Sequence, residues 1–511
     1  MSLPASSTAC AAPGTLPRRL ALVTALVVSA LAGCTTAGKD FEPLAVAAPS
    51  SWSEHHGGDA SLQAPIAASA ALPADRWGVF GDDVLASLQA RAVKDSPDMR
   101  VATLRVLQSR VQESMVSAQR GVQAGVAAGV GRQRQSEYGS ASRLVNAIGG
   151  PNTQQLLDVL TSPFTLYDVG FDASWEPDLW GRVLRTEEAA SAGSDAQRSA
   201  LRQARLSVNA EVARVYFALR SAQRQRLLVA NELAAVQELS ELLAAQSRSG
   251  LSDDSALNRQ RAQLAALRAA VPALLAQEAQ AMNRLTLLCG AEPGALNAVL
   301  APVPTARIGP PLIDLRLGLP SDLVRHRPDV AAAEARLRAA TANIGIAMAD
   351  LYPRIVLGAR FGLEAVGSGK FGDWGSRQWS VGPSLSLPLF DHGRRQATIT
   401  LRELQQQEAA VAFQQTVLAA WHEVDDAISS YVAETQRAAQ LSARTRSSED
   451  EAGLARARYA NGLTNYLPVL VATTTAIDAR RELVDSQARA QVALAAVYKT
   501  LGDDGAGQAT R

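Results

Sequence analysis

The residue types that most often carry out catalysis or bind metals are few in this chain and widely spaced. The five histidines are His55, His56, His326, His392 and His422. Only the first two are adjacent, and they lie in a polar segment without the ligand spacing of a zinc site. The stretch Gly367-Ser368-Gly369-Lys370 is similar to part of a phosphate-binding loop, but that pattern needs glycine where Glu364 stands. We therefore predict no enzyme, no metal site and no cofactor.

One cysteine does have a sequence context that predicts chemistry. Arg18 and Arg19 precede an almost wholly apolar run, 20–32, which ends in Leu31-Ala32-Gly33-Cys34. The run is shorter than the about 20 residues that span a bilayer, so it reads as a secretion signal. Its end resembles a bacterial lipobox, in which the cysteine is lipidated and becomes the mature N-terminus. Cys34 is therefore the predicted lipid-attachment site, with a plain signal peptide and a chance cysteine as the alternative. Thr35 follows, and the absence of Asp there favours the outer membrane.

Composition excludes several classes of protein. Lys plus Arg number 50 and Asp plus Glu 49, whereas nucleic-acid binders carry a strong basic excess. Because Cys10 lies in the leader, Cys289 is the one cysteine besides Cys34 in the mature chain, so no intrachain disulfide is predicted. No later run of about 18 apolar residues occurs, so no transmembrane helix or ion-driven pump is expected.

The chain contains an internal repeat. Ser96-Pro97-Asp98 matches Arg327-Pro328-Asp329 at an offset of 231 residues. Further along, the offset becomes 212 and stays constant, as in Gly181-Arg182 with Gly393-Arg394 and Leu288-Cys289-Gly290 with Thr500-Leu501-Gly502. The first copy therefore carries an insertion between about 132 and 166. Each copy reads as helix, strand, loop, strand, very long helix, turn and helix.

Each copy has two stretches in which apolar and polar or small residues alternate. They cover 122–131, 165–176, 353–363 and 378–390. Such alternation over about ten residues is typical of transmembrane β-strands with one lipid-facing side, although half-buried soluble sheets alternate too. The linking segments, 132–165 and 364–377, are rich in Gly, Ser and Asn, like the outer loops of barrels. On the polar side, the residues predicted to face a lumen are Asp168, Asp172, Glu176, Arg354 and Arg360.

Four strands cannot close a membrane barrel, since the smallest have about eight. Open edges are costly in lipid, because unpaired backbone groups find no water there. If these strands span a membrane, the chain must oligomerise, and the strands alone do not choose between two copies and three.

A very long helix is predicted after the second strand of each copy. The segment 182–249 lacks proline, and a 4,3 stripe from Val208 to Leu243 indicates coiled-coil packing. The second copy carries a stripe in the same register from Ala420 to Leu441. An ordinary coiled coil is the competing interpretation, but it leaves the alternating strands unexplained.

Together these features resemble the TolC-like outer-membrane efflux protein family, specifically its lipoprotein (NodT-type) branch, which partners resistance–nodulation–division pumps. The matching motifs include Trp77-Gly78-Val79-Phe80-Gly81-Asp82-Asp83, Leu319-Pro320-Ser321-Asp322-Leu323, Tyr352-Pro353, Pro388-Leu389-Phe390-Asp391 and Arg458-Tyr459 with Gly462 and Tyr466. They cover nearly the whole mature chain, and their combination is highly specific.

The resemblance implies a homotrimer anchored in outer-membrane lipid that docks a periplasmic adaptor protein and an inner-membrane efflux pump. It also implies a periplasmic tip, closed at rest, that is formed by the two helix turns. The residues assigned to this tip and gate are Gly250, Asp253, Asp254, Arg458, Tyr459, Gly462 and Tyr466. Family members often place aspartates where this chain has Ala256 and Val471, which puts an acidic gate ring in doubt. Asp253 and Asp254 could form such a ring or simply stabilise a helix N-terminus.

The implied fold is mainly α with membrane β, with four strands per chain contributing to a trimeric 12-stranded β-barrel continued by a long periplasmic α-helical coiled-coil barrel. The predicted segments are a signal peptide (1–33), a lipid-anchored linker (34–75), a first repeat (76–300), a second repeat (301–504) and a flexible tail (505–511). The long helices are expected at 182–249 and 394–460, and the shorter ones at 253–290 and 466–501.

Three functions remain open at this point. The first is the passive exit duct of a tripartite efflux pump for drugs or other small molecules. The second is the same duct serving type I protein secretion or metal export. The third is a structural periplasmic coiled-coil lipoprotein that forms no channel.

Overall fold

The structure, a computed structural model, describes residues 36–45, 56–63, 77–250, 254–303 and 326–502. The predicted signal peptide, Cys34, Asp253, the motif at 319–323 and the tail at 505–511 lie outside the described residues. The chain divides into two compact units: Met1–Phe41, Gln112–Ala190 and Ala339–Gln406 in the first, and Glu42–Val111, Ser191–Arg338 and Gln407–Arg511 in the second. No helix among the described residues has the length and apolarity needed to cross a membrane.

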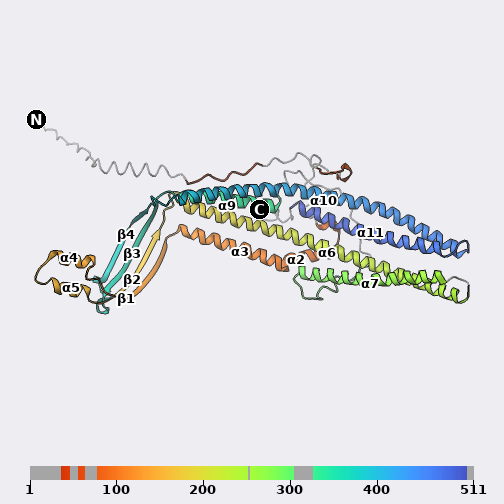
Figure 1. Ribbon diagram of the computed structural model, residues 1–511, viewed down its shortest axis with the longest axis horizontal. Coiled ribbons are helices and arrows are strands. Elements are labelled where there is room, and N and C mark those ends of the chain that lie inside the picture. The colour runs from red at the N-terminus through yellow and green to blue at the C-terminus, as the bar shows by residue number, and fades with distance from the viewer. Residues whose placement is uncertain (1–35, 46–55, 64–76, 251–253, 304–325, 503–511) are drawn as a thin grey trace, which may run out of the picture. The chain divides into compact units, whose positions relative to one another are not determined.

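The first unit holds one antiparallel sheet, in which the strands lie side by side in chain order (Figure 1). They are β1 (Gln123–Gln133), β2 (Phe164–Trp175), β3 (Arg354–Val366) and β4 (Arg377–Ser386). All four predicted strands are therefore confirmed, but two ends differ. β2 stops before Glu176, and β4 stops well short of 390. β4 ends where its partner strand begins, since its last residue, Ser386, pairs with Arg354, the first residue of β3.

The register aligns the apolar residues of all four strands. Val126 lies opposite Phe171, Phe171 opposite Phe361, and Phe361 opposite Trp379. Each of these four side chains is at least 49% exposed in the single chain. One face of the sheet is thus a continuous apolar surface, as the alternation predicted, and around these four residues the described part of the chain leaves it largely uncovered.

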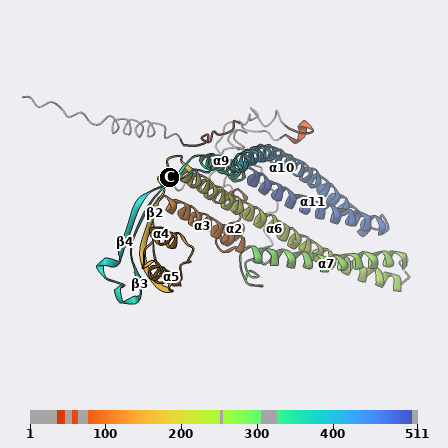
Figure 2. The ribbon, with the colours of Figure 1, turned by 60° about the vertical axis from the view of Figure 1, so that its left-hand side comes forward.

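The insertion of the first copy is not an irregular loop. It folds into two short helices, α4 (Ser140–Ile148) and α5 (Thr153–Thr161), which lie beside the end of the curved sheet where β1 ends and β2 begins (Figures 1 and 2). The Gly, Ser and Asn content of 132–165 suggested a loop, but these residues cluster around the helix ends. Gly149 and Gly150, between the helices, both have positive φ, which glycine adopts without steric cost.

The two copies match in their long helices. α6 (Arg182–Arg248) and α10 (Arg394–Ala460) each have 67 residues. Each is followed by a shorter helix, α7 (Asp254–Leu288) or α11 (Leu467–Thr500), and α2 (Asp83–Asp95), α3 (Pro97–Ser117) and α9 (Pro328–Ala349) complete the main helices. The constant offset read from the sequence therefore reflects helices of equal length.

The second unit is held together by the apolar stripes of these helices. Leu85 and Leu88 of α2 pack with Val212 and Leu219 of α6 and with Leu285 of α7, and all five are almost fully buried. A second cluster joins α9, α10 and α11. Burying a leucine-sized side chain contributes about 1.5–3 kcal/mol, so these clusters account for much of the unit's stability.

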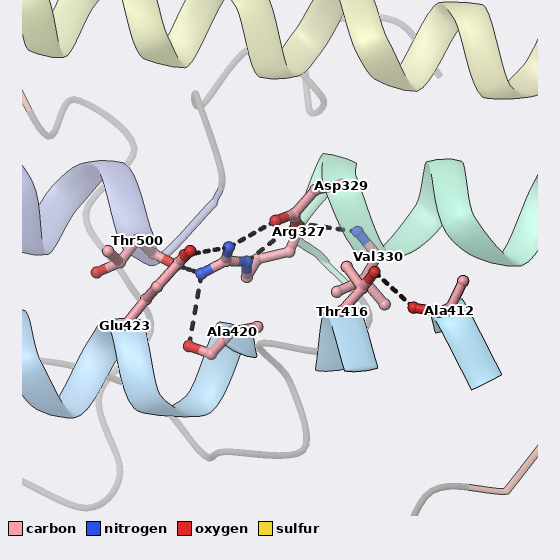
Figure 3. A network of polar contacts seen from close by, with 8 residues as sticks. All are labelled: Arg327, Asp329, Val330, Ala412, Thr416, Ala420, Glu423 and Thr500. Carbon is pink, nitrogen blue, oxygen red and sulfur yellow. Dashed lines mark hydrogen bonds and ion pairs between the residues drawn. The ribbon is translucent and has the colours of Figure 1, made fainter. Parts of the chain in front are cut away.

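A buried arginine ties the start of α9 to the end of α11 (Figure 3). Arg327 donates to both carboxylate oxygens of Asp329, at 3.0 and 2.6 Å, and to one oxygen of Glu423 at 2.6 Å. It also donates to the carbonyl of Thr500 at 3.0 Å. The last carbonyls of a helix lack intrahelical partners, so Arg327 satisfies one of them as well as its own buried charge.

The same junction in the two copies depends on a glycine. Gly290 and Gly502 end the shorter helices with φ of +60° and +78°. A Cβ on Gly290 would lie 2.3 Å from the carbonyl oxygen of Asp95, and one on Gly502 would lie 2.4 Å from Cγ of Arg327. Each glycine thus permits close contact with the segment before the matching Pro-Asp of its own copy.

We predict that Gly290→Ala destabilises the protein far more than Gly462→Ala. Both glycines have positive φ, which costs alanine about 1–2 kcal/mol, but a Cβ on Gly462 would meet nothing within 4 Å. Only Gly290→Ala adds a clash with backbone. We expect this variant to lose more than about 3 kcal/mol of the free energy of unfolding. The measurement is the midpoint of thermal unfolding followed by circular dichroism. Equal midpoints for the two variants would contradict this account of the junction.

Candidate functional site

The polar face of the sheet brings together most of the residues predicted to face a lumen. Asp172 lies opposite Arg360 in the register, with 3.8 Å between the carboxylate and the guanidinium. Asp168 lies opposite Gly129, and its carboxylate would lie 2.6 Å from a Cβ at that glycine. Both aspartates therefore project from the face opposite the apolar surface. That this face lines a lumen stays a prediction.

Glu176 differs from its predicted setting, because it follows β2 and lies outside the strand. It accepts hydrogen bonds from Arg182 at 3.0 and 3.1 Å and forms an ion pair with Arg354 at 2.8 Å. Burial acts to raise the pKa of Glu176, but the hydrogen bonds and charges of the two arginines outweigh burial and hold that pKa below its ordinary value. Glu176 thus joins the start of β3 to the start of α6.

A pocket of about 320 Å³ lies at these strand ends. Its lining includes Glu176, Trp180, Arg182, Tyr352 and Arg354. Trp180 and Tyr352 stack with their ring centroids 4.8 Å apart, and the indole N–H of Trp180 donates to the carbonyl of Pro353. Glu176 pairs with both Arg182 and Arg354, so these three charged residues of the lining join the ends of the strands to α6.

The chain just after Cys34 is fixed to the first unit. Arg185 of α6, only 4% exposed, donates to the carbonyl of Ala37 and to the carboxylate of Asp40 at 2.6 Å. The backbone N–H of Ala37 donates to the carbonyl of Trp180. The start of the predicted linker is therefore docked against the first turn of α6, a contact that no pattern in the sequence predicted.

The second predicted site lies at the turns between the long and short helices. Gly250 and Gly462 both have positive φ, at +70° and +71°. After α10, the N–H of Gly462 donates to the carbonyl of Tyr459, and that of Leu463 donates to the carbonyl of Arg458. This pair of bonds is the Schellman ending, in which Gly462 takes the left-handed position after the helix, and its role at a gate stays a prediction. In the first turn, Ser247 donates to Asp254 at 2.6 Å.

Two tyrosines join the two helical hairpins near these turns. The hydroxyl of Tyr459, from α10, donates to Gln246 of α6 at 3.4 Å. The hydroxyl of Tyr466 donates to Gln260 of α7 at 3.1 Å. The two rings contact each other edge to face, with centroids 5.5 Å apart. We call these four residues the tip clasp, because each hydrogen bond connects the first hairpin with the second.

The tip clasp is buried on the Tyr466 side. Burial, assisted by the neighbouring Tyr459, raises the pKa of Tyr466 to about 12, so its hydroxyl stays protonated and can donate. Gln260 is fully buried and also donates to the carbonyl of Val236 at 3.1 Å. Around the clasp lie Leu243, Leu257, Val469 and several alanines.

Gln246 and Gln260, the acceptors of the clasp, are not among the tip residues predicted from the sequence. The signal in the sequence was that Gln260 interrupts the apolar stripe of α7 between Leu257 and Leu267, where a buried polar side chain needs a partner. Of the other predicted tip residues, Arg458 is exposed and contributes its backbone carbonyl. Val471, where family members often have aspartate, is 57% exposed.

No metal-binding group of three or more His, Cys, Asp or Glu occurs in the part of the chain that the structure describes. Cys289 is buried beneath α2, and its thiol donates to the carbonyl of Leu88. Burial raises the pKa of this thiol, so the reactive thiolate is disfavoured.

Comparison with known proteins identifies the fold. Residues 88–291 and 319–503 match the family model described as outer membrane efflux protein, which is well over half of the chain. Outer membrane protein OprJ of Pseudomonas aeruginosa is 32% identical over 94% of this chain and 95% of its own length. Pyoverdine export outer membrane protein OpmQ of Pseudomonas putida is 30% identical over 96% and 98%.

A solved structure agrees with these relatives. The outer-membrane channel OprN superposes with a TM-score of 0.80 at 29% identity, covering 92% of this chain and 99% of that one. The family consists of channel proteins and not of enzymes. This decides against the third function considered above, a structural periplasmic lipoprotein that forms no channel. The long helices, the four-stranded sheet and the internal repeat are those of this family. The chain therefore belongs to the outer membrane efflux protein family and is an outer-membrane channel of an efflux pump.

Proposed function

We propose that three copies of this chain close their sheets into one barrel and form the passive exit duct of a tripartite pump. The partners are a periplasmic adaptor and an inner-membrane pump that supplies the energy. Small molecules would leave through the duct without chemical change.

The observation that carries the proposal is the open sheet with its bare apolar face. β1 and β4 are the two edges, since the order is β1-β2-β3-β4 and each pairs with one neighbour. Unpaired backbone groups in lipid cost several kcal/mol each, so the edges must pair with other copies. Three sheets of four strands give 12 strands, the number that the family resemblance implies.

The helices support the same conclusion. Val101, Leu104 and Val111 of α3 are 47–60% exposed and share one face of the helix. On α10, Val411 and Leu418, seven residues apart, are 62% and 51% exposed. Apolar stripes of this kind need a partner helix, and a neighbouring copy would supply it.

We predict that Val381→Arg blocks assembly while Gly382→Arg does not. Val381 lies on the apolar face, where arginine in the middle of the bilayer costs about 2–4 kcal/mol per chain. Gly382, its neighbour, lies on the polar face, and a Cβ there would meet nothing within 4 Å. Heat-resistant trimers on gels and single-channel currents in planar bilayers would measure the effects.

The expected result is loss of trimers for Val381→Arg, and normal trimers with altered ion selectivity for Gly382→Arg. The reverse pattern would show that the polar face meets lipid. Normal assembly of both variants, or a conductance-free monomer from the unaltered chain, would overturn the barrel.

The tip clasp would hold the periplasmic end of the duct shut until the adaptor docks. We predict that the double variant Tyr459→Phe/Tyr466→Phe opens more often, because it loses two hydrogen bonds between hairpins while keeping the rings. Each bond is worth about 0.5–1.5 kcal/mol net, so open probability in planar bilayers should rise by about tenfold.

The matched control is Ser247→Ala, which removes a hydrogen bond within the first hairpin only. It should leave open probability unchanged. If the control opened the channel as much as the double variant does, the contacts between hairpins would not be the gate.

We also propose that Cys34 carries the lipid anchor. Cys34 would then be the first residue of the mature chain. It comes shortly before Ala37 and Asp40 in the sequence, to which Arg185 donates hydrogen bonds. We predict that cells fed radiolabelled palmitate label the wild type and the Cys10→Ser control, and that Cys34→Ser is unlabelled. Persistent label on Cys34→Ser would place the modification elsewhere.

A further inference from the structure

A second stretch of the predicted linker, residues 56–63, contacts α10. We call it the N-terminal strap. At one end, Asp425 of α10 accepts from the backbone N–H of Gly57 at 3.0 Å and contacts the ring of His56. At the other end, Gln436 of α10 donates to the carbonyl of Ser61 at 2.9 Å. Asp425 and Gln436 are three helical turns apart, so the strap follows one face of the helix.

His56 lies between two hydrogen-bond acceptors. Its Nδ1 is 2.7 Å from a carboxylate oxygen of Asp425, and its Nε2 is 3.0 Å from the carbonyl oxygen of Asp59. Neither acceptor can donate to the ring while Asp425 is ionised. A neutral imidazole carries one N–H and can serve only one of them, whereas the imidazolium carries two and serves both. The geometry therefore fits the protonated ring.

The surroundings favour the charged form as well. The side chain of His56 is only 4% exposed. The charged groups that act on it are the carboxylate of Asp425 from α10 and that of Asp59 from the strap itself. The hydrogen bond to Asp425, then that to the Asp59 carbonyl, raises the pKa of His56 above its ordinary value, although burial opposes the shift.

We propose that the N-terminal strap is a pH-dependent latch on α10, closed when His56 carries both ring protons and loosened when it loses one. In the sequence, the strap lies between Cys34, the proposed site of the lipid anchor, and the helices of the second unit. Its release would uncover the face of α10 around Asp425 and Gln436, which the strap contacts when docked.

The direction of the pH dependence follows from the shift. Below the ordinary histidine pKa of about 6.5, the ring is charged whether the strap is docked or free, so docking has its full strength. As pH rises through the higher pKa of the docked state, the docked ring must release a proton. It then loses one of its two hydrogen bonds, and docking weakens.

Hydrogen–deuterium exchange of the full-length protein in detergent tests the latch. The readout is protection of the peptide covering 56–63, in which the amides of Gly57, Ser61, Leu62 and Gln63 are hydrogen-bonded. After correction for the intrinsic effect of pH on exchange, we expect protection to fall by about tenfold between about pH 5 and pH 9, the effect of one hydrogen bond to a charged group.

Two variants and one control make the result specific. His56→Gln should have low protection at both pH values and no pH dependence. Asp425→Asn keeps a hydrogen-bond acceptor but removes the negative charge, so the fall in protection with rising pH should be smaller than in the wild type. His422→Gln, one turn earlier on α10, should behave like the wild type. Equal protection of the wild type at both pH values, or a full tenfold fall in His56→Gln, would overturn the proposal.

Discussion

A sheet of four strands has two edges, and hydrocarbon offers no hydrogen-bonding partner to either. This constraint governs the rest of the molecule. The apolar residues of β1 to β4 align into one uninterrupted face, which suits lipid and is unsuited to water. The edges of β1 and β4 are left for other copies of the chain. A channel of this family is therefore incomplete as a single chain. The exposed apolar stripes of α3 and α10 likewise need other copies of the chain to cover them.

The internal repeat supplies two matched hairpins that must end together. α6 and α10 have the same number of residues, so the turns that follow them fall at equivalent positions. That equality is what lets Tyr459 reach Gln246 and Tyr466 reach Gln260 from the other hairpin. An insertion in one long helix alone would displace one turn relative to the other. The insertion that the first copy does carry lies between β1 and β2, where α4 and α5 can accommodate it.

Periodicity along the sequence predicted the strands, the long helices and the repeat, because each follows from a local pattern of apolar residues. It could not predict contacts between segments far apart in the chain. Gln260 and Arg185 are polar residues on helices, and no local pattern indicates that one binds a tyrosine 206 residues away or that the other holds Asp40. The helices within 132–165 were missed for a different reason, since each is only 9 residues long and is flanked by residues typical of turns, Gly139 and Gly149 for α4 and Asn152 and Ser162 for α5.

The second unit combines two kinds of packing, and the difference suits a gate. Around Leu85, Tyr216 and Leu285 the core is made of large, fully buried side chains, whose separation would cost several kcal/mol each. Around the tip clasp the buried cluster is smaller: alanines such as Ala452 and Ala472 make up half of it, Leu243 and Leu257 are among its larger members, and hydrogen bonds of about 1 kcal/mol net add to the contacts between the hairpins. Water can replace such bonds as helices move apart, whereas it cannot replace leucine contacts. An adaptor that gains a few kcal/mol by docking could therefore shift the tip while the remainder of the helical unit stays packed.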